Sequence, residues 1–185
     1  MTLELLGAPG SPYTRKMLSV LRFRRIPYIY RIGTHREPHP GLPEPKVKLL
    51  PTFYFRGESG VEAVTDSTPI IRRLEAEYEG RSIIPAHPVL AFLDALIEDY
   101  ADEWLTKAMF HYRWAHEADA RNAGPQLIFW RDSTLPEREA REAAAAISRR
   151  QIDRLYVVGS NPATAETIEQ SYRRLIDLLL SLIHI

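Results

Sequence analysis

The order of apolar patterns at the start of the chain is the feature that most restricts its fold. A short apolar run at Leu3–Leu6 is followed by a helical pattern over Pro12–Arg25 and by a second apolar run at Tyr28–Tyr30. Two strands joined by a helix of this length form a parallel pair through a right-handed crossover. The chain is therefore expected to begin with a β-α-β unit.

A proline-rich segment interrupts this pattern, and a second group of strands and helix follows it. Residues 35–45 contain four prolines and a glycine, so they cannot form a regular helix or a central strand. Short strands are predicted at Thr52–Phe55 and Val61–Val64 with a hairpin loop between them, followed by a helix over Asp66–Glu79 that ends at Gly80. The element order β-α-β…β-β-α is that of a thioredoxin-type fold.

The sequence after Pro88 has a helical pattern throughout. A long helix is predicted from one apolar stripe, which consists of Leu90, Leu93, Ile97, Tyr100 and Trp104. A second helix is expected to begin near Thr134, because Thr134 and Glu137 have the spacing of a capping box. A third helix is expected after Pro162.

This change of pattern divides the chain. We expect an α/β thioredoxin-like domain at residues 1–80, a linker at residues 81–88 and an all-α helical domain at residues 89–185. The helical domain is expected to be incomplete, because the apolar run over residues 178–185 ends without a stop signal. Order is expected to decay along the last helix, where four side chains need a partner surface: Leu178, Leu179, Leu182 and Ile183.

Composition excludes several classes of partner and chemistry. Lysine plus arginine equals aspartate plus glutamate, so the formal net charge is zero, and the basic clusters at residues 22–25 and 149–150 are expected on solvated helix faces. We therefore expect no nucleic-acid partner. No run of about 18 apolar residues exists and the start of the chain lacks the pattern of a signal peptide, so we expect no membrane partner.

The sequence contains no cysteine. This excludes disulfides and every mechanism that uses a protein thiol, and it suits a cytoplasmic protein. The pair His111 and His116 suggests a metal site, but the two residues are five apart rather than three or four and no cysteine accompanies them. We therefore expect these histidines to serve packing and a helix surface, and we expect no metal.

Three short motifs could carry chemistry. Ser11 and Pro12 lie at the predicted start of the first helix, where a hydroxyl and the helix dipole can stabilise a thiolate, although Ser11 can equally be only an N-cap. Pro51 comes directly before a strand. Asp66 and Ser67 lie at the start of another helix, where they either cap the helix or bind the charged ends of a small peptide.

In this order, the motifs resemble those of the glutathione S-transferase family. The resemblance rests on Ser11-Pro12-Tyr13 after the first strand, Pro51 before the third and Asp66-Ser67 after the fourth, and it covers nearly the whole chain. It implies that Ser11 contacts the glutathione sulfur and that Leu50, before a cis-proline at Pro51, pairs with the cysteinyl backbone. It also implies that Asp66 and Ser67 hold the γ-glutamyl end.

The chain departs from the family pattern at three places. Leu50 stands where the family often has valine, and the family's second helix cannot be placed between residues 36 and 48. The family's buried Ser/Thr-x-x-Asp capping motif is missing from the second half, and residues 161–164 do not supply it.

The resemblance implies a transferase that conjugates the thiolate of glutathione, its co-substrate, to an apolar electrophile. Serine at position 11 argues against glutaredoxin-like chemistry, which needs a protein thiolate. Five acids follow one another along the predicted long helix, where a solvated helix face is favoured over a general-acid pair: Asp94, Glu98, Asp99, Asp102 and Glu103. The resemblance allows a homodimer in which one of these acids reaches the glutathione amine of a second subunit. Tyr112 and Trp114 either line the electrophile pocket or pack in the core. The alternative is a non-catalytic binding or assembly module with the same fold.

Overall fold

The computed structural model describes residues 2–183, and the side chains within this range up to residue 181. The chain divides into two compact units, residues 1–86 (unit 1) and residues 87–185 (unit 2). Each unit is described by itself. No helix in the described part of the chain is long and apolar enough to cross a membrane.

Unit 1 has the element order that the sequence predicts. Its elements are β1 (Leu3–Gly7), α1 (Pro12–Arg24), β2 (Tyr28–Ile32), β3 (Thr52–Gly57), β4 (Gly60–Val64) and α2 (Ser67–Glu77). The predicted β-α-β and β-β-α order is confirmed, with ends that differ from the predicted ones by at most two residues. The segment between β2 and β3, which contains the prolines, holds neither helix nor strand.

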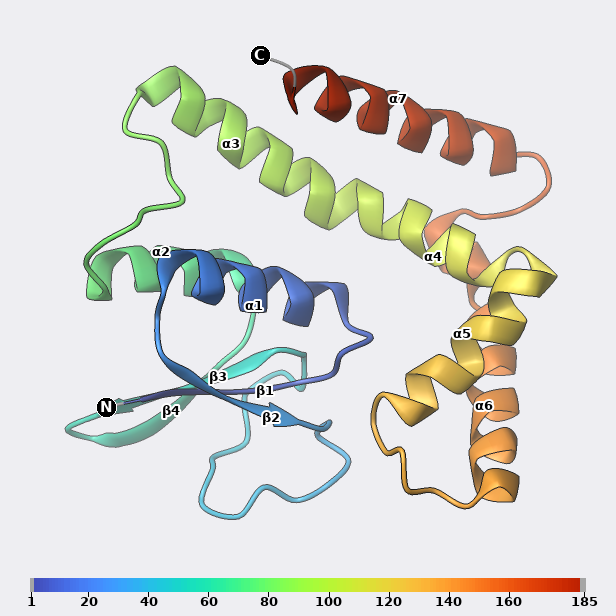
Figure 1. Ribbon diagram of the computed structural model, residues 1–185, viewed down its shortest axis with the longest axis horizontal. Coiled ribbons are helices and arrows are strands. Elements are labelled where there is room, and N and C mark those ends of the chain that lie inside the picture. Colours follow the sequence, from blue (N-terminus) through green and yellow to red (C-terminus); the bar gives the residue numbers. More distant parts are fainter. Residues whose placement is uncertain (1, 184–185) are drawn as a thin grey trace. The chain divides into compact units, whose positions relative to one another are not determined.

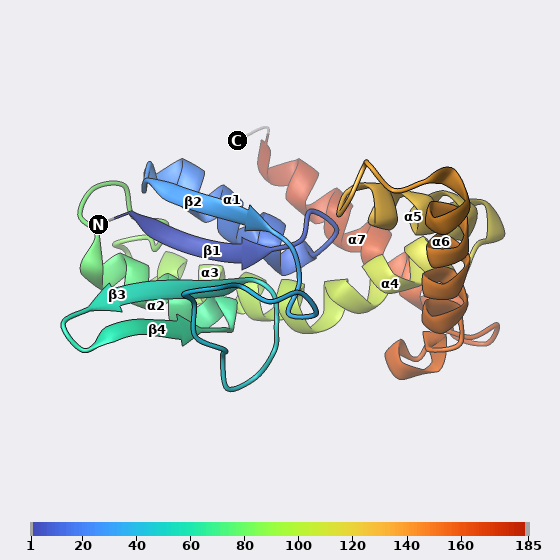
Figure 2. The ribbon, with the colours of Figure 1, turned by 90° about the horizontal axis from the view of Figure 1, so that it is seen from below.

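The four strands form one sheet in the order β2-β1-β3-β4 (Figure 2). β1 and β2 are parallel, whereas β3 is antiparallel to both β1 and β4. Leu6 pairs with Thr52, and Phe53 pairs with Val64. This register brings the end of β1, the start of β3 and the end of β4 to the same edge of the sheet, which we call the loop edge.

The core of unit 1 lies between the sheet and its two helices. α1 and α2 cover the same face of the sheet (Figure 1). They bury one cluster of large side chains, which consists of Leu3, Leu5, Met17, Leu18, Leu21, Ile26, Phe53, Phe55, Ile70, Ile71 and Leu74. Strand residues Leu3 and Leu5 face this cluster because side chains alternate along a strand. The thioredoxin-like arrangement is thereby closed on one side by α1 and α2.

One residue of the basic cluster 22–25 is not on a solvated face. Arg24 is buried, and its guanidinium group donates hydrogen bonds to the carbonyl oxygens of Arg81 at 2.9 Å and Tyr78 at 2.5 Å. It also lies 3.2 Å from a carboxylate oxygen of Glu75. The prediction of a solvated face is wrong for Arg24, because this side chain ties α1 to the end of α2.

Unit 2 contains only helices among its described residues. They are α3 (Pro88–Tyr100), a π-helical segment (Ala101–Leu105), α4 (Thr106–Trp114), α5 (Glu117–Phe129), α6 (Glu137–Ile152), a 3₁₀ turn (Leu155–Val158) and α7 (Ala165–Ile183). α5 and α6 lie side by side (Figure 1). The predicted all-α character is confirmed, but the sequence pattern does not separate α4 from α5.

Small residues set the distance between α5 and α6. A Cβ atom added at Gly124 would lie 2.3 Å from Ser148 Oγ and 3.0 Å from the carbonyl oxygen of Ala144. Ala140 and Ala144 of α6 are buried together with Ile128 of α5. The two helix backbones therefore approach so closely that only glycine fits at position 124.

Two details of unit 2 differ from expectation. α6 has Pro136 rather than Thr134 at its N-cap, and the backbone N–H of Thr134 donates to Asp132 Oδ1 at 2.9 Å. The prediction of a capping box at Thr134 is therefore wrong, because Asp132 instead forms a local turn with Thr134. α7 continues to Ile183 with Leu178 64% and Leu180 50% exposed. Leu182 and Ile183 were expected to need a partner surface, but their side chains lie outside the described residues.

Candidate functional site

The predicted site residues of unit 1 meet at the loop edge of the sheet. Ser11 follows β1, Leu50 and Pro51 precede β3, and Asp66 and Ser67 follow β4. These three chain segments are up to 56 residues apart in sequence, and the strand register alone brings them together. No periodicity in the sequence predicts this convergence, which depends on the antiparallel direction of β3.

Ser11 is the N-cap of α1. Its backbone is extended, Pro12 occupies the first helical position, and its Oγ accepts a hydrogen bond from the backbone N–H of Thr14 at 3.2 Å. Among the described residues, none accepts a hydrogen bond from the hydroxyl group of Ser11. It can therefore donate to a group bound in front of the helix, beside the positive end of the helix dipole.

A close approach between β1 and α1 fixes the position of Ser11. Thr14 is fully buried, and a Cβ atom added at Gly7 would lie 2.6 Å from Thr14 Cγ2. The missing side chain at Gly7 lets the first turn of α1 pack directly against the end of the strand. The backbone N–H of Ser11 also donates to the carbonyl oxygen of Ala8 at 2.9 Å, which closes the turn.

The Leu50–Pro51 peptide bond is cis, as expected. A histidine of the proline-rich segment supports this region. His35 Nε2 lies 2.8 Å from Thr52 Oγ1 and 3.2 Å from the carbonyl oxygen of Leu49, and Thr52 Oγ1 donates to the same carbonyl oxygen at 2.7 Å. No sequence pattern singles out His35, because its role comes from contacts with residues 14 and 17 positions away.

Asp66 and Ser67 begin α2, as their types suggest. Asp66 is the N-cap, and one of its carboxylate oxygens accepts from the backbone N–H of Thr68 at 3.2 Å. Its backbone φ of 79° is unusual for a residue with a side chain. Such strain costs about 1–3 kcal/mol and is concentrated at functional sites. The interpretation of Asp66 as a helix cap is confirmed. The backbone strain is an additional observation that favours a binding role.

Lys16 brings a positive charge to this helix start. Its ammonium group donates to Ser67 Oγ at 3.1 Å, which joins α1 to α2 across 51 residues of sequence. Ser67 itself is buried. Sequence reasoning missed this pairing, because Lys16 by itself is an ordinary residue of a helix surface. Together with the N–H groups at the start of α2, Lys16 makes this corner suited to a carboxylate.

Residues 5–82 match the family model for the N-terminal domain of glutathione S-transferases. This similarity concerns the residues of unit 1. The match covers the end of β1, the other three strands and both helices of this unit, including Ser11, Pro51 and Ser67. None of the curated proteins matches the chain in sequence.

The comparison with solved structures finds similarity to two glutathione transferases and an isomerase. The Tau class glutathione S-transferase of mango (Mangifera indica) is 18% identical with a TM-score of 0.48, over 89% of this chain and 84% of that chain. Maleylacetoacetate isomerase from Anaeromyxobacter dehalogenans is 14% identical with a TM-score of 0.47, over 91% and 83%. A glutathione transferase homologue from Burkholderia, with bound glutathione, is 12% identical with a TM-score of 0.47, over 94% and 100%.

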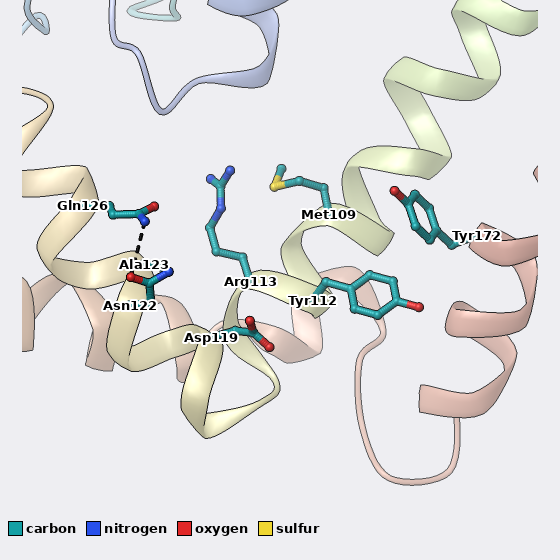
Figure 3. Close-up of a pocket in the computed structure, with 8 residues that line it drawn as sticks. All are labelled: Met109, Tyr112, Arg113, Asp119, Asn122, Ala123, Gln126 and Tyr172. Atoms are coloured by element: carbon teal, nitrogen blue, oxygen red, sulfur yellow. Dashed lines mark hydrogen bonds between the residues drawn. The ribbon is translucent and has the colours of Figure 1, made fainter. Parts of the chain in front are cut away.

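Unit 2 contains a pocket of about 400 Å³ between α4, α5 and α7 (Figure 3). Tyr112 lines it, and its ring lies 5.3 Å from that of Tyr172 on α7. Met109 and Arg113, which lie on the same helix as Tyr112, also line this pocket (Figure 3). Trp114 is buried in a small cluster and borders a second pocket of about 570 Å³ beside α6. Of the two aromatic residues considered from sequence, Tyr112 lines the first pocket and Trp114 packs in the core.

One group of described residues in unit 2 could hold a metal ion, namely His111, His116 and Glu169. The two histidines were expected not to share a helix face. They do not lie on one helix at all, because α4 ends at Trp114 and His116 is the N-cap of α5. The break, rather than helical spacing, determines where the two imidazoles lie.

Proposed function

We propose that this chain binds glutathione at the loop edge and conjugates its thiolate to an electrophilic small molecule. The observation that carries the proposal is the meeting of two helix N-termini at one sheet edge, one with the hydroxyl of Ser11 and the other with Asp66 and Ser67. A tripeptide with a thiol in the middle and charged ends matches these groups. The match of residues 5–82 to the family supports the same ligand.

Ser11 stabilises the thiolate of bound glutathione. Its Oγ lone pair is used by the N–H of Thr14, so the hydroxyl proton remains available to donate to the sulfur. The dipole of α1, a helix of 13 residues, favours a negative charge at the same point. Both effects lower the pKa of the thiol, and the thiolate is the nucleophile that attacks the electrophile.

The other segments position the tripeptide. The backbone of Leu50 pairs with the cysteinyl residue, which is a role taken from the family resemblance. Ser67 and the N–H groups at the start of α2 receive the carboxylate of the γ-glutamyl end, with the nearby ammonium group of Lys16 as a counter-charge. The carboxylate of Asp66 receives the amino group. Binding both ends turns the reaction into one between oriented groups, which lowers its entropic cost.

We propose two partners besides glutathione. The first is an apolar electrophile as co-substrate, and the second is another copy of the chain in a homodimer. The pocket at Tyr112 supports the first, since two tyrosines, a methionine and an alanine line it beside four polar or charged side chains. The exposed apolar residues of α3 support the second, because an apolar patch of this kind marks an interface. Reduced glutathione is a feature of the cytosol, and we propose that the protein works there. The mass of the protein by light scattering tests the homodimer.

The role of Ser11 is tested by two substitutions with different effects on the helix. Ser11→Ala removes both the cap and the donor, whereas Ser11→Gly removes the donor at little cost to the cap and adds no charge. Both variants are expected to reduce the thiolate fraction of bound glutathione about tenfold at neutral pH, as for the loss of one charge-assisted hydrogen bond. The measurement is thiolate absorbance of the complex against pH. Ser19→Ala, on the exposed face of the same helix, is the control.

A titration curve that is the same in Ser11→Gly as in the unsubstituted protein would show that Ser11 is only a cap. Retention on immobilised glutathione without turnover of several electrophiles would instead favour the non-catalytic binding module.

The role of Asp66 is tested by relieving its strain. Asp66→Gly places a residue that tolerates positive φ at this position, and glycine is nearly as good an N-cap. The variant is expected to be more stable by about 1 kcal/mol while its affinity for glutathione falls about tenfold. Urea unfolding and calorimetric titration with glutathione measure the two effects. Unchanged affinity would remove Asp66 from the site.

A further inference from the structure

The corner between α4 and α5 gathers two imidazoles and one carboxylate. α4 ends at Trp114, Ala115 is its C-cap, and the chain then leaves the helical conformation at His116 before α5 begins. This turn brings the ring of His116 to 5.4 Å from the ring of His111. Glu169 reaches the same place from α7, more than 50 residues later in the chain. Three elements of unit 2 thus contribute one side chain each.

The distances within this group suit a small divalent cation. Glu169 Oε1 lies 3.5 Å from His111 Nε2 and 3.5 Å from His116 Nε2. One ligand atom of each residue lies within 4.8 Å of those of the other two. Donor atoms around a tetrahedral zinc ion are about 3.4 Å apart, given bond lengths of about 2.0–2.1 Å. Both contacts to the carboxylate already have this separation.

The atoms of His111 and Glu169 that face away from the centre of the group form contacts with other side chains, as the outer atoms of metal ligands usually do. His111 Nδ1 lies 2.7 Å from Ser160 Oγ, in a contact where both side chains are buried. With the proton on Nδ1, His111 donates to Ser160 and presents the lone pair of Nε2 to the centre of the group. The second oxygen of Glu169 accepts from Arg173 Nη2 at 2.8 Å, which leaves Oε1 directed to the two imidazoles.

The buried nitrogen Nε2 of His111 is the atom that indicates a bound ligand. The side chain is 1% exposed, and among the residues that the structure describes no hydrogen-bond partner reaches this nitrogen. A buried polar atom without a partner costs about 1–3 kcal/mol. The carboxylate oxygen at 3.5 Å is too far for a good hydrogen bond. A cation placed between the three donor atoms would satisfy Nε2, and the ring of His116 serves no capping role that would compete.

We propose that His111, His116 and Glu169 bind a divalent cation of the zinc class. Two neutral imidazoles and one carboxylate are ligands that zinc prefers, with water in the fourth position. The ion would tie the first half of α7 to the turn between α4 and α5. This role concerns the architecture of unit 2 and does not depend on glutathione binding.

Titration calorimetry with Zn²⁺ on the whole, metal-free and tag-free protein, without glutathione, tests the proposal. One equivalent is expected to bind. His116→Ala removes a ligand that is 47% exposed, so the fold is expected to be retained, and Glu169→Gln removes the charge. Each variant is expected to weaken binding by about 100-fold or more, since even the loss of an outer contact costs about 10-fold to 100-fold. Ser160→Ala, which removes such an outer contact, is expected to cost about tenfold.

His87→Ala is the matched control. His87 is an exposed histidine of the same unit that caps α3 through Nδ1, so its loss should leave the zinc affinity unchanged. Co²⁺ in place of Zn²⁺ is expected to show the visible absorption of a four-coordinate ion, and this absorption should be lost in His116→Ala. Absence of stoichiometric binding, or a zinc affinity that is the same in His116→Ala or is lowered equally in His87→Ala, would overturn the proposal.

Discussion

Unit 1 and unit 2 hold themselves together in different ways. Unit 1 buries one continuous cluster of eleven large apolar residues between its sheet and two helices, counted over the described residues. Unit 2 has two small clusters, of which one contains Trp114, Ala120 and Ala123 and the other Ile128, Ala140 and Ala144. The free energy of folding from apolar burial scales with buried area. Unit 1 is therefore expected to be the more stable of the two.

The same contrast appears at the surface. α3 has no buried residue, and six of its large apolar side chains are exposed: Val89, Leu90, Phe92, Leu93, Leu96 and Ile97. The predicted stripe of this helix exists, but it is not part of a core. A helix can thus satisfy its backbone hydrogen bonds and have the expected pattern while its apolar face contributes little to stability. The following predictions test this comparison.

Phe53→Ala is expected to have the largest effect. Phe53 is fully buried in β3, and its ring is stacked with Phe55 at 6.2 Å. Removal of a buried phenylalanine side chain costs about 3–5 kcal/mol. Hydrogen exchange resolved by peptide should show the loss in β1, β3 and α1. All three tryptophans, Trp104, Trp114 and Trp130, lie in unit 2, so their fluorescence reports that unit separately. A loss below 1 kcal/mol would contradict the assigned core.

Gly124→Ala is expected to destabilise unit 2 by about 2 kcal/mol. The gain in helix propensity of about 1 kcal/mol opposes the clash with Ser148 Oγ and the Ala144 carbonyl group, and overpacking of this kind costs about 1–3 kcal/mol or more. Tryptophan fluorescence during urea unfolding measures the change. The double variant Gly124→Ala with Ser148→Ala should recover part of the loss, whereas purely additive effects would show that Ser148 is not the obstacle.

Unit 1 was predictable from local pattern because each element has its own signal. The Ser11-Pro12 helix start, the apolar runs and the proline before β3 lie within a few residues of what they determine. The position of the site residues at one edge also follows once the strand directions are known. His35 and Lys16 could not be found in this way, since their contacts span 14 to 51 residues and neither has a distinctive neighbourhood in sequence.

Unit 2 was less predictable, because helical spacing was extended over a break. Residues 111–116 were interpreted as one helix, on which His111 and His116 cannot face the same side. The end of α4 at Trp114 changes their geometry completely, and Glu169 comes from a distant helix. Thr134 was misassigned for a similar reason, since Asp132 offered a competing acceptor for its N–H. Arg24 was misassigned because its partners follow α2.

Glu4→Gln is expected to cost about 1–2 kcal/mol at pH 7 and to change the pH dependence of unit 1. The Glu4 carboxylate accepts hydrogen bonds from Arg56 at 2.6 Å and Arg31 at 2.8 Å, and these contacts lower its pKa from the ordinary value of 4.5. Both arginines are partly exposed, so the smaller end of the range for charged hydrogen bonds applies.

The sign of the pH effect follows from this lowered pKa. The stabilisation by Glu4 is fully present above the pKa of the unfolded chain and is lost as the pH falls through the lower pKa of the folded state. Urea unfolding from pH 7 to pH 3 should show a steeper loss in the unsubstituted protein than in Glu4→Gln. Parallel curves would mean that the Glu4 contacts do not persist in solution.

Phe92→Ser is expected to have the smallest effect on the free energy of unfolding, below about 0.5 kcal/mol. Phe92 is 65% exposed on α3, so its removal gives up little buried area, in contrast to the fully buried Phe53. Tryptophan fluorescence during urea unfolding at low and high protein concentration measures the effect. At low concentration the midpoint should stay close to that of the unsubstituted protein, because α3 contributes only its own backbone to the stability of the monomer. A loss that grows with protein concentration would show that α3 is buried against a second copy, because association stabilises the folded state by mass action. A loss of several kcal/mol that does not depend on concentration would show instead that α3 belongs to a core within the chain. The comparison between a unit with its own core and a unit without one would then no longer hold.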